Sequence, residues 1–211
     1  MSSTAISAQG STVQIENTTG VAKNVTGLAL GFPTIVSATS HGFANGDVVS
    51  FASLTGNTTL NGVTAVVKNV TTNTFAVDVD TTGGSAWVSG GTATPATWTA
   101  IANIRTFSGF DGSASEIDKT NMSSTAKEFM LGLVDPGQFT MEVDLDQADA
   151  GQLALRATQV AGSAKYFKLT LPNSKTATFQ AYVKKISSQG GVDAAVRNSV
   201  DLRITGAVTW A

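Results

Sequence analysis

Alternation of apolar and polar residues is the feature of this sequence that most constrains its fold. The clearest segment runs from Phe139 to Leu145, and residues 167–171, 177–183 and 200–208 repeat its pattern. Successive side chains of a β-strand point to opposite faces, so a period of two is typical of a strand with one buried and one solvent-facing side. The segments are short and separated by turn residues. The sequence therefore predicts a mainly β protein, a β-sandwich or open barrel.

A single helix interrupts the strands, and we place it roughly at Gln147–Val160. Asp146 is the expected N-cap and Gly162 the expected stop, because an Asp side chain accepts bonds from free N–H groups and Gly readily adopts the left-handed conformation that ends helices. The side expected to face the core is formed by Leu153 and Ala157, with Leu155 and Thr158 flanking them. This helix should flank the β-sandwich.

Composition excludes several classes of function. The 211 residues include no cysteine and one histidine, which excludes disulfide frameworks, thiolate metal sites and multi-histidine metal sites. A formal net charge of −2 at pH 7 leaves no basic footprint for tight nucleic-acid binding. No apolar run approaches the ~20 residues of a membrane span, and residues 1–10 lack the pattern of a secretory signal. We expect no cofactor, no metal and no membrane contact.

Charged residues divide the chain into two zones. Residues 21–94 contain five of them, whereas residues 95–211 contain 22. A compositional shift of this kind is a signal of a domain boundary. The charge-poor zone is predicted to form a small all-β unit, with strands at Thr34–Thr39, Asp47–Ser53, Gly62–Val70, Thr74–Asp80 and Gly91–Ala96.

A hairpin with an insertion in its turn would explain how the two zones connect. Residues 11–16 alternate as a short strand, and residues 95–104 resume the pattern. The two segments are expected to pair, because a long insertion in an exposed turn adds little loop-closure entropy. The predicted domains are therefore a β-sandwich domain of residues 1–20 with 95–211, and an inserted small β-domain of residues 21–94.

Candidate chemical sites are few. His41 stands in a Ser-His-Gly-Phe turn, which we expect it to orient, and the chain lacks the Gly-x-Ser-x-Gly elbow of a serine hydrolase. Asp47, Asp78 and Asp80 could bind calcium, but without an Asp-x-Asp-x-Asp-Gly loop they are expected to serve solubility. We expect no enzyme. The tryptophans are expected to be structural anchors rather than a sugar platform; they are Trp87, Trp98 and Trp210.

The order of charges in the second zone suits head-to-tail assembly. Residues 111–149 hold nine acids and two bases, and residues 151–211 hold eight bases and two acids. Opposite charges on two different surfaces favour a heterologous contact, which closes into rings or extends as a filament. The alternative is that strands simply alternate charges on solvated faces.

Residues 98–133 form the most distinctive stretch. A hydrophobic strand is followed by Gly109-Phe110-Asp111-Gly112, by Ser115-Glu116-Ile117-Asp118-Lys119-Thr120, by residues 122–129 and by Gly132-Leu133. Residues 166–184 and the closing strand with Ile204-Thr205-Gly206 add to the pattern. Together these segments resemble the major tail tube proteins of long-tailed bacteriophages, over roughly residues 8–20 and 95–211.

The resemblance implies a β-sandwich with a flanking helix, six of which close a ring. Rings would stack into a tube through which DNA passes without specific binding. Further implied partners are other tail proteins, such as the tape measure and the tail terminator. The implied location is the tail of the virion, after assembly in the host cytoplasm. Residues 108–133 would form an extended loop between subunits or rings, ordered only on polymerisation; the contact residues expected in it are Glu116, Asp118, Lys119, Thr120, Ser124, Lys127 and Glu128.

A channel for DNA is expected to have neutral or acidic walls, because a basic wall would hold the phosphates. Glu142 and Asp144 share a strand face and are the expected lumen-facing acids, the alternative being an ordinary solvated strand side. The segment 21–94 departs from the tail tube pattern. It resembles a small β-module of phage virion proteins, through Ser40-His41-Gly42-Phe43 and Thr74-Phe75 among other motifs, and its size implies a place outside the tube.

Two other functions stay open from the sequence. A virion decoration or adhesion protein would bind a host-surface glycan with the Thr-rich β unit. The tube protein of a contractile secretion system would keep the same fold in another setting.

Overall fold

The protein is described here by a computed structural model that covers residues 5–211, so the first four residues of the predicted 1–20 segment lie outside it. The predicted fold class is confirmed, since the described residues form β-strands with one α-helix, and the sheets are open. The chain divides into two compact units. Unit 1 contains the residues up to Ala100 together with Tyr166–Thr178 and Thr209–Ala211. Unit 2 contains Ile101–Lys165 and Phe179–Val208.

Unit 1 holds most strands of the first half of the chain. In sheet order they run β3-β4-β7-β6-β5-β8-β1-β13, and β2 pairs with β8. Their bounds are β1 Thr12–Thr19, β2 Lys23–Asn24, β3 Gly27–Ala29, β4 Thr34–Ser37, β5 Val48–Ala52, β6 Thr64–Lys68, β7 Thr74–Val77, β8 Thr92–Ala100 and β13 Lys165–Thr170. The five strands predicted between residues 34 and 96 are all present.

The predicted pairing of residues 11–16 with residues 95–104 is confirmed. Strand β1 pairs with β8 antiparallel, with Ile15 opposite Thr99 and Glu16 opposite Trp98. On its other edge β1 pairs with β13, where Ile15 lies opposite Phe167. Residues 20–91 therefore connect two strands that are direct neighbours in the sheet.

The segment between these two strands has a hydrophobic core of its own. Phe51, Phe75, Leu60 and Val67 are at most 2% exposed. Phe75 contacts the Phe43 ring edge-on at 5.3 Å between centroids. Apart from Ala93 of β8, the buried residues of this core all belong to the segment, so its strands bury their apolar sides mainly against one another.

Polar contacts fix the inserted segment to the neighbouring strands of unit 1. Lys168 on β13 lies 3.5 Å from the Asp47 carboxylate and 4.5 Å from the centroid of the Trp98 ring, and its side chain is only 15% exposed. The Tyr166 hydroxyl donates to the Thr64 carbonyl at 3.2 Å. A partly buried lysine between an anion and an aromatic face holds its partners in place.

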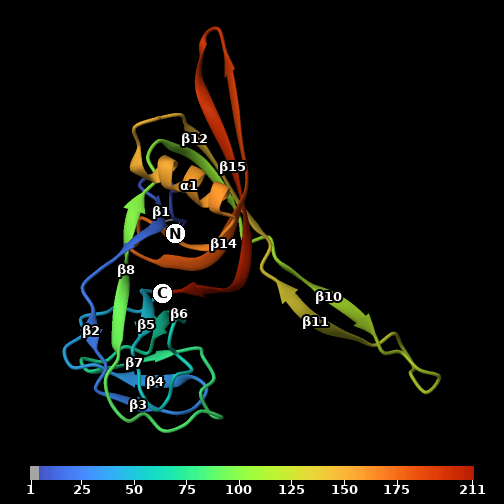
Figure 1. The fold of residues 1–211 in the computed structure, drawn as a ribbon. Helices are drawn as coiled ribbons and strands as arrows, with labels where there is room; N and C mark the ends of the chain where they lie inside the picture. The colour runs from blue at the N-terminus through green and yellow to red at the C-terminus, as the bar shows by residue number, and fades with distance from the viewer. Residues whose placement is uncertain (1–4) are drawn as a thin grey trace. The chain divides into compact units, whose positions relative to one another are not determined.

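Unit 2 contains a sheet in the order β14-β15-β12-β9 and a separate two-stranded ribbon, β10-β11 (Figure 1). Phe139, Met141 and Val143 of β12 are at most 1% exposed and alternate with polar residues as predicted. Phe139 contacts the Phe179 ring at 5.3 Å between centroids. The bounds are β9 Ile104–Gly109, β10 Ser113–Asp118, β11 Phe129–Asp135, β12 Gln138–Asp144, α1 Ala150–Ala161, β14 Thr176–Gly191 and β15 Ala194–Trp210.

The helix α1 begins later than predicted. Asp149 is the N-cap, with its carboxylate accepting from the Gln152 N–H at 2.8 Å, so the prediction of Asp146 is wrong. Asp146 instead accepts from the Ala148 N–H in the preceding turn. The predicted stop is confirmed, because Gly162 has φ 62° and its N–H bonds to Thr158 and Gln159 carbonyls. No helix among residues 5–211 is long and apolar enough to cross a membrane.

The predicted core side of α1 is wrong for two residues. Leu153 is 49% exposed and Ala157 is exposed, whereas Leu155 and Thr158 are buried as expected. The reason is Gln152, which is 3% exposed and donates to the backbone carbonyls of Asp144 and Ala102. A buried polar side chain that satisfies loop carbonyls is costly to remove, and its place in the core turns Leu153 outward.

Candidate assembly surfaces

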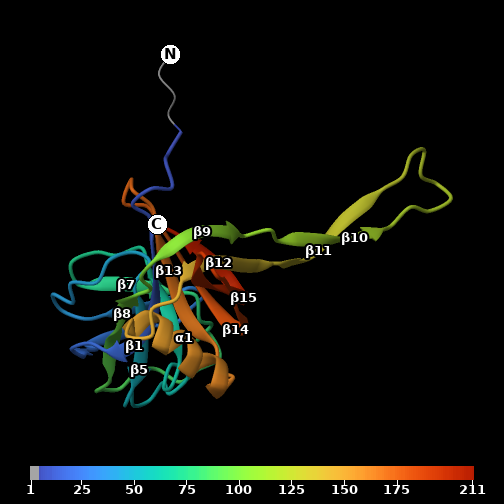
Figure 2. The same ribbon diagram turned by 90° about the horizontal axis from the view of Figure 1, so that it is seen from above.

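The ribbon (residues 113–135) occupies most of the predicted 108–133 loop. Ser113 pairs with Asp135, and Asp118 pairs with Phe129. In both views the ribbon leads away from the sheet and α1 of unit 2 (Figures 1 and 2). The expected extended loop is thus a two-stranded antiparallel hairpin whose backbone groups are paired across the strands.

Register assigns the ribbon's side chains to two faces. Glu116 lies opposite Leu131, and Ile117 lies opposite Met130. Cross-strand partners share a face, and neighbours along a regular strand do not. The register shifts between Ala114 and Glu116, where residues 132 and 133 of β11 oppose the single residue 115 of β10, and this bulge keeps Leu131 and Val134 on one face. The acidic face therefore carries Ala114, Glu116, Asp118, Phe129, Leu131 and Val134, and the neutral face carries Ile117, Met130 and Leu133.

Both faces of the ribbon expose large apolar side chains. On the acidic face Leu131 is 70% and Val134 71% exposed, and on the neutral face Leu133 is 93% exposed. Single exposed apolar residues are common, but a contiguous group marks a contact surface. Strand β11 is thus largely apolar, and its large side chains from Phe129 to Val134 are 50 to 93% exposed.

The residues predicted as loop contacts lie at or next to the tip of the ribbon, from Asp118 at the end of β10 to Glu128, except Glu116, which lies within β10. The Asp118 carboxylate accepts from the Thr120 N–H at 2.8 Å, and the Thr120 hydroxyl accepts from the Glu128 N–H at 2.9 Å. The Thr120 hydroxyl and N–H, with Lys127 at 3.7 Å, lower the pKa of Asp118. The Ser124 hydroxyl accepts from the Asn121 N–H, and the Lys119 N–H donates to the Glu128 carbonyl, so local hydrogen bonds order the tip.

A tight elbow sets the direction in which the ribbon leaves the sheet. The Asp111 carboxylate accepts from the Gln138 N–H at 2.8 Å, and the Asp135 carboxylate accepts from the Gly137 N–H at 2.9 Å. Arg203 also bonds Asp135 at 2.5 Å. Gly137 has φ 81°, and a Cβ there would come within 2.3 Å of the Asp111 carboxylate. Only glycine fits this position without strain.

The Gly137 N–H and Arg203 lower the pKa of Asp135. The carboxylate of Asp135 is therefore the form that the elbow binds.

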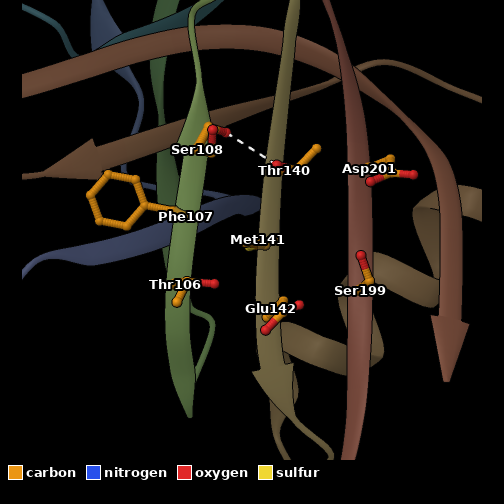
Figure 3. Close-up of a pocket in the computed structure, with 8 residues that line it drawn as sticks. All are labelled: Thr106, Phe107, Ser108, Thr140, Met141, Glu142, Ser199 and Asp201. Atoms are coloured by element: carbon orange, nitrogen blue, oxygen red, sulfur yellow. Dashed lines mark hydrogen bonds between the residues drawn. The ribbon is translucent and has the colours of Figure 1, made fainter. Parts of the chain in front are cut away.

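The predicted lumen acids, Glu142 and Asp144, lie on the polar side of β12, opposite its core side. Figure 3 shows Glu142 on this face of the four-stranded sheet. Across the strands, Glu142 has Thr106 and Ser199 as neighbours, and Thr140 has Ser108 and Asp201. These residues line a groove of about 260 Å³, to which Phe107 and Met141 also contribute. The face is thus built of hydroxyls and carboxylates from three strands.

The acids of this face differ in how their charge is compensated. Asp144 lies 3.2 Å from Arg105 and 3.5 Å from Arg197. Among the ion pairs formed by residues 5–211, none includes Glu142 or Asp201. The uncompensated negative charge of the face therefore resides on Glu142 and Asp201.

His41 and the three aspartates considered as calcium ligands each contact other groups of the chain. His41 is 2% exposed, and its Nδ1 accepts from the Phe43 N–H at 3.0 Å while its ring contacts the Phe75 ring edge-on. The three candidate calcium acids are used separately: Asp47 binds Lys168, Asp78 binds Lys68, and Asp80 accepts from Thr82. Within residues 5–211 no group of three or more His, Cys, Asp or Glu could hold a metal.

Trp87 and Trp98 have identified contacts within unit 1. The Trp87 ring nitrogen donates to the Gly90 carbonyl at 3.1 Å, and its side chain packs on the core of the inserted segment. The Trp98 ring lies under Lys168. These contacts agree with the expected anchor role. Trp210 is 58% exposed.

A profile of the lambda-like phage tail tube family matches residues 66–168, a region that includes the whole ribbon and the first part of the sheet of unit 2. The resemblance to phage tail tube proteins is thereby confirmed. The match supports a structural role in a phage-type tail. A second profile, of the FCCH domain of ubiquitin-activating enzyme E1, matches residues 31–96, most of the inserted segment. No curated protein matches the chain significantly.

Solved structures of phage-like particles share parts of the fold at low sequence identity. A chain of the virion of a native gene transfer agent is 16% identical, with TM-score 0.48 over 54% of this chain and 88% of that chain. A chain of the tail of the empty gene transfer agent particle, of C6 symmetry, is 17% identical, with TM-score 0.46 over 63% and 92%. A chain of the six-fold symmetrised baseplate of the anti-feeding prophage is 12% identical, with TM-score 0.44 over 82% and 97%.

Sequence reasoning missed two parts of these surfaces. Asp201 alternates outward on its strand, but only the register with β12 puts it beside Thr140. The exposed run from Phe129 to Val134 was visible as an apolar sequence. A continuous apolar run predicts burial, and only the fold reveals that this one projects into solvent.

Proposed function

We propose that this chain is the subunit of a phage-type tail tube, in which copies close into rings of six and the rings stack. Its role is assembly rather than catalysis. The ribbon carries the proposal, because Leu131, Leu133 and Val134 are at least 70% exposed and lie in the region matched by the tail tube profile. Burying this surface against other copies would supply the hydrophobic driving force for polymerisation.

In this proposal residues 1–20 and 95–211 form the tube body, and residues 21–94 form an inserted domain on its outside. The pairing of β1 with β8 supports the insertion, since the segment leaves and re-enters the sheet at adjacent strands. An outward position is argued from size: a folded unit of that length would obstruct a channel of the width of duplex DNA. The proposed partners are other copies of the chain, tail proteins such as a tape measure and a tail terminator, and DNA in transit within the virion tail.

The polar face of β9, β12 and β15 is proposed to line the lumen. The carboxylates of Glu142 and Asp201, which form no ion pair among the described residues, would repel phosphates weakly. Their neighbours on the face carry hydroxyls and add no positive charge; they are Thr106, Thr140 and Ser199. Counterion release, which holds DNA to basic surfaces, has no counterpart on such a wall. Asp144 joins this face with its charge offset by two arginines.

Sedimentation velocity of the concentrated protein tests the assembly role. The ends of the ribbon are register partners, Ser113 and Asp135, so residues 114–134 can be replaced by two glycines that close the same ladder. We expect the full chain to sediment as polymers and the shortened chain as a folded monomer. An exposed apolar residue of the inserted segment, Val88→Ser, serves as control and should polymerise normally. Equal sedimentation of the full and shortened chains would contradict the proposal.

Charge reversal on the polar face tests the lumen separately. Tubes of the double variant Glu142→Lys, Asp201→Lys should retain DNA in a salt-dependent way, because each added cation releases counterions from the phosphates. Wild-type tubes should release it. Tubes of the variant that hold no more DNA than wild type would place this face away from the lumen.

A further inference from the structure

A stripe of apolar residues on α1 faces solvent although the helix packs on a sheet. Leu153 is 49% and Val160 89% exposed, and Ala157 is exposed between them. Residues at these spacings of four and seven lie on one side of a helix. Arg156 belongs to the same side, so the helix stripe (Leu153, Arg156, Ala157, Val160) combines apolar area with one cation.

The acidic face of the ribbon has matching properties. Phe129, Leu131 and Val134 are 50 to 71% exposed. Glu116 stands directly opposite Leu131 and adds an anion to the apolar area. The apolar row of the ribbon is long enough to cover that of the helix, since residues 129–134 of a strand span about 16 Å and residues 153–160 of a helix about 10 Å.

The two charges have no partner in their own chain. Among the ion pairs of residues 5–211, neither Glu116 nor Arg156 takes part. Asp118, the other acid of that face, already faces Lys127 at 3.7 Å. Opposite charges at the edges of two apolar patches fix the register of a contact and exclude wrong partners.

The ribbon cannot cover the helix stripe of its own chain. Both belong to unit 2, and the ribbon leads away from the sheet on which α1 packs (Figure 2). The elbow at Gly137, with Asp111 and Asp135 bonded across it, holds this direction. The partner must therefore be another molecule.

We propose that the acidic face of the ribbon packs on the helix stripe of a second copy of this chain, with Glu116 beside Arg156. The contact rests on the proposed self-assembly and gives it a specific geometry. Since the two surfaces differ, the contact is heterologous: each copy offers a ribbon to one neighbour and a helix to another, so assembly propagates. The neutral face of the ribbon is free to meet a further copy.

Cysteine crosslinking tests the pairing directly, because the natural chain contains no cysteine. Full chains carrying Leu131→Cys are mixed with tagged full chains carrying Leu153→Cys, allowed to assemble, and treated with a short thiol crosslinker. We expect heterodimers at a yield severalfold above the matched pair Leu133→Cys with Leu153→Cys, which probes the neutral face. Equal or inverted yields from the two pairs overturn the proposal.

Charge exchange adds a second readout. Glu116→Arg and Arg156→Glu should each weaken polymerisation about fivefold by placing like charges together, and the double variant should restore it. Failure of the double variant to recover, with both single variants impaired, overturns the pairing. If crosslinks are absent while sedimentation shows polymers, this contact is wrong and the tube function stands. If both polymers and crosslinks are absent, the proposed function fails with it.

Discussion

The inserted segment and the ribbon use apolar residues in opposite ways. In the inserted segment Phe51, Phe75 and Leu60 are closed into a core and are at most 2% exposed. In the ribbon, Leu131, Leu133 and Val134 are at least 70% exposed. A sheet of several strands can enclose its own apolar side chains, whereas a two-stranded ribbon cannot. The first region is therefore stabilised within one chain, whereas the second would be covered only in the proposed assembly.

The sharpest contrast should come from truncating one aromatic ring in each region. Phe75→Ala removes a fully buried ring that contacts Phe43 and Phe51, and we expect a loss of about 3–5 kcal/mol in the free energy of unfolding. Phe129→Ala on the ribbon should cost less than about 0.5 kcal/mol yet impair polymerisation. Urea titration of the dilute protein, followed by sedimentation of the concentrated one, separates the two effects. Similar losses of stability would abolish the distinction.

The elbow should respond more strongly than an ordinary glycine turn. Gly137→Ala must accommodate φ 81° and a Cβ 2.3 Å from the Asp111 carboxylate, and we expect about 2 kcal/mol of destabilisation together with weaker assembly. Gly162→Ala is the matched control, since its φ is 62° and its added Cβ meets nothing within 4 Å. The control should cost about 1 kcal/mol and leave assembly intact. Equal urea midpoints for the two variants would show that the elbow is not rigid.

The attachment of the inserted segment depends on a partly buried ion pair. Asp47→Asn removes the anion beside Lys168, whose side chain is 15% exposed, and we expect a loss of about 1 kcal/mol in unfolding free energy. Asp78→Asn breaks the more exposed pair with Lys68, where the side chains are 34% and 48% exposed, and should change stability by less than about 0.5 kcal/mol. If Asp78→Asn proved the more damaging, the attachment would not rest on Lys168.

The smallest expected effect is a pH dependence of the elbow. The Gly137 N–H and Arg203 lower the pKa of Asp135 in the folded chain. A carboxyl whose pKa is depressed on folding stabilises above its unfolded pKa, so the contribution is complete above about pH 4 and is lost as the pH falls through the folded pKa. The amide shift of Gly137 should report this loss below about pH 4, and Asp135→Asn should abolish it. A titration of that amide near neutral pH would contradict the assignment.

The sequence predicted strands with a buried side better than it predicted exposed surfaces. The strand Thr34–Ser37 and the core residues Phe139, Met141 and Val143 were predicted because alternation records which side of a strand is buried. The helix side was not, since a polar residue, Gln152, takes the core position to satisfy loop carbonyls. Nothing local distinguishes β11 from a core strand.

The candidate surfaces show the same limit. Glu142 and Asp144 were correctly expected to share a strand face. The arginines that offset Asp144 come from residues 105 and 197, and their approach depends on the register of three strands. Spacing along the chain carries no information about that register. Side-chain alternation is therefore predictable locally, whereas charge pairing across strands requires the fold.

A cryo-EM map of polymers formed by the concentrated full chain tests the central claim most directly. The account predicts a hollow tube in which the ribbon of each subunit is covered on its acidic face by α1 of a neighbouring copy, with the inserted segment on the outside. A map in which Leu131 and Val134 remain in solvent, or a protein that stays monomeric at every concentration with its ribbon uncovered, would contradict it.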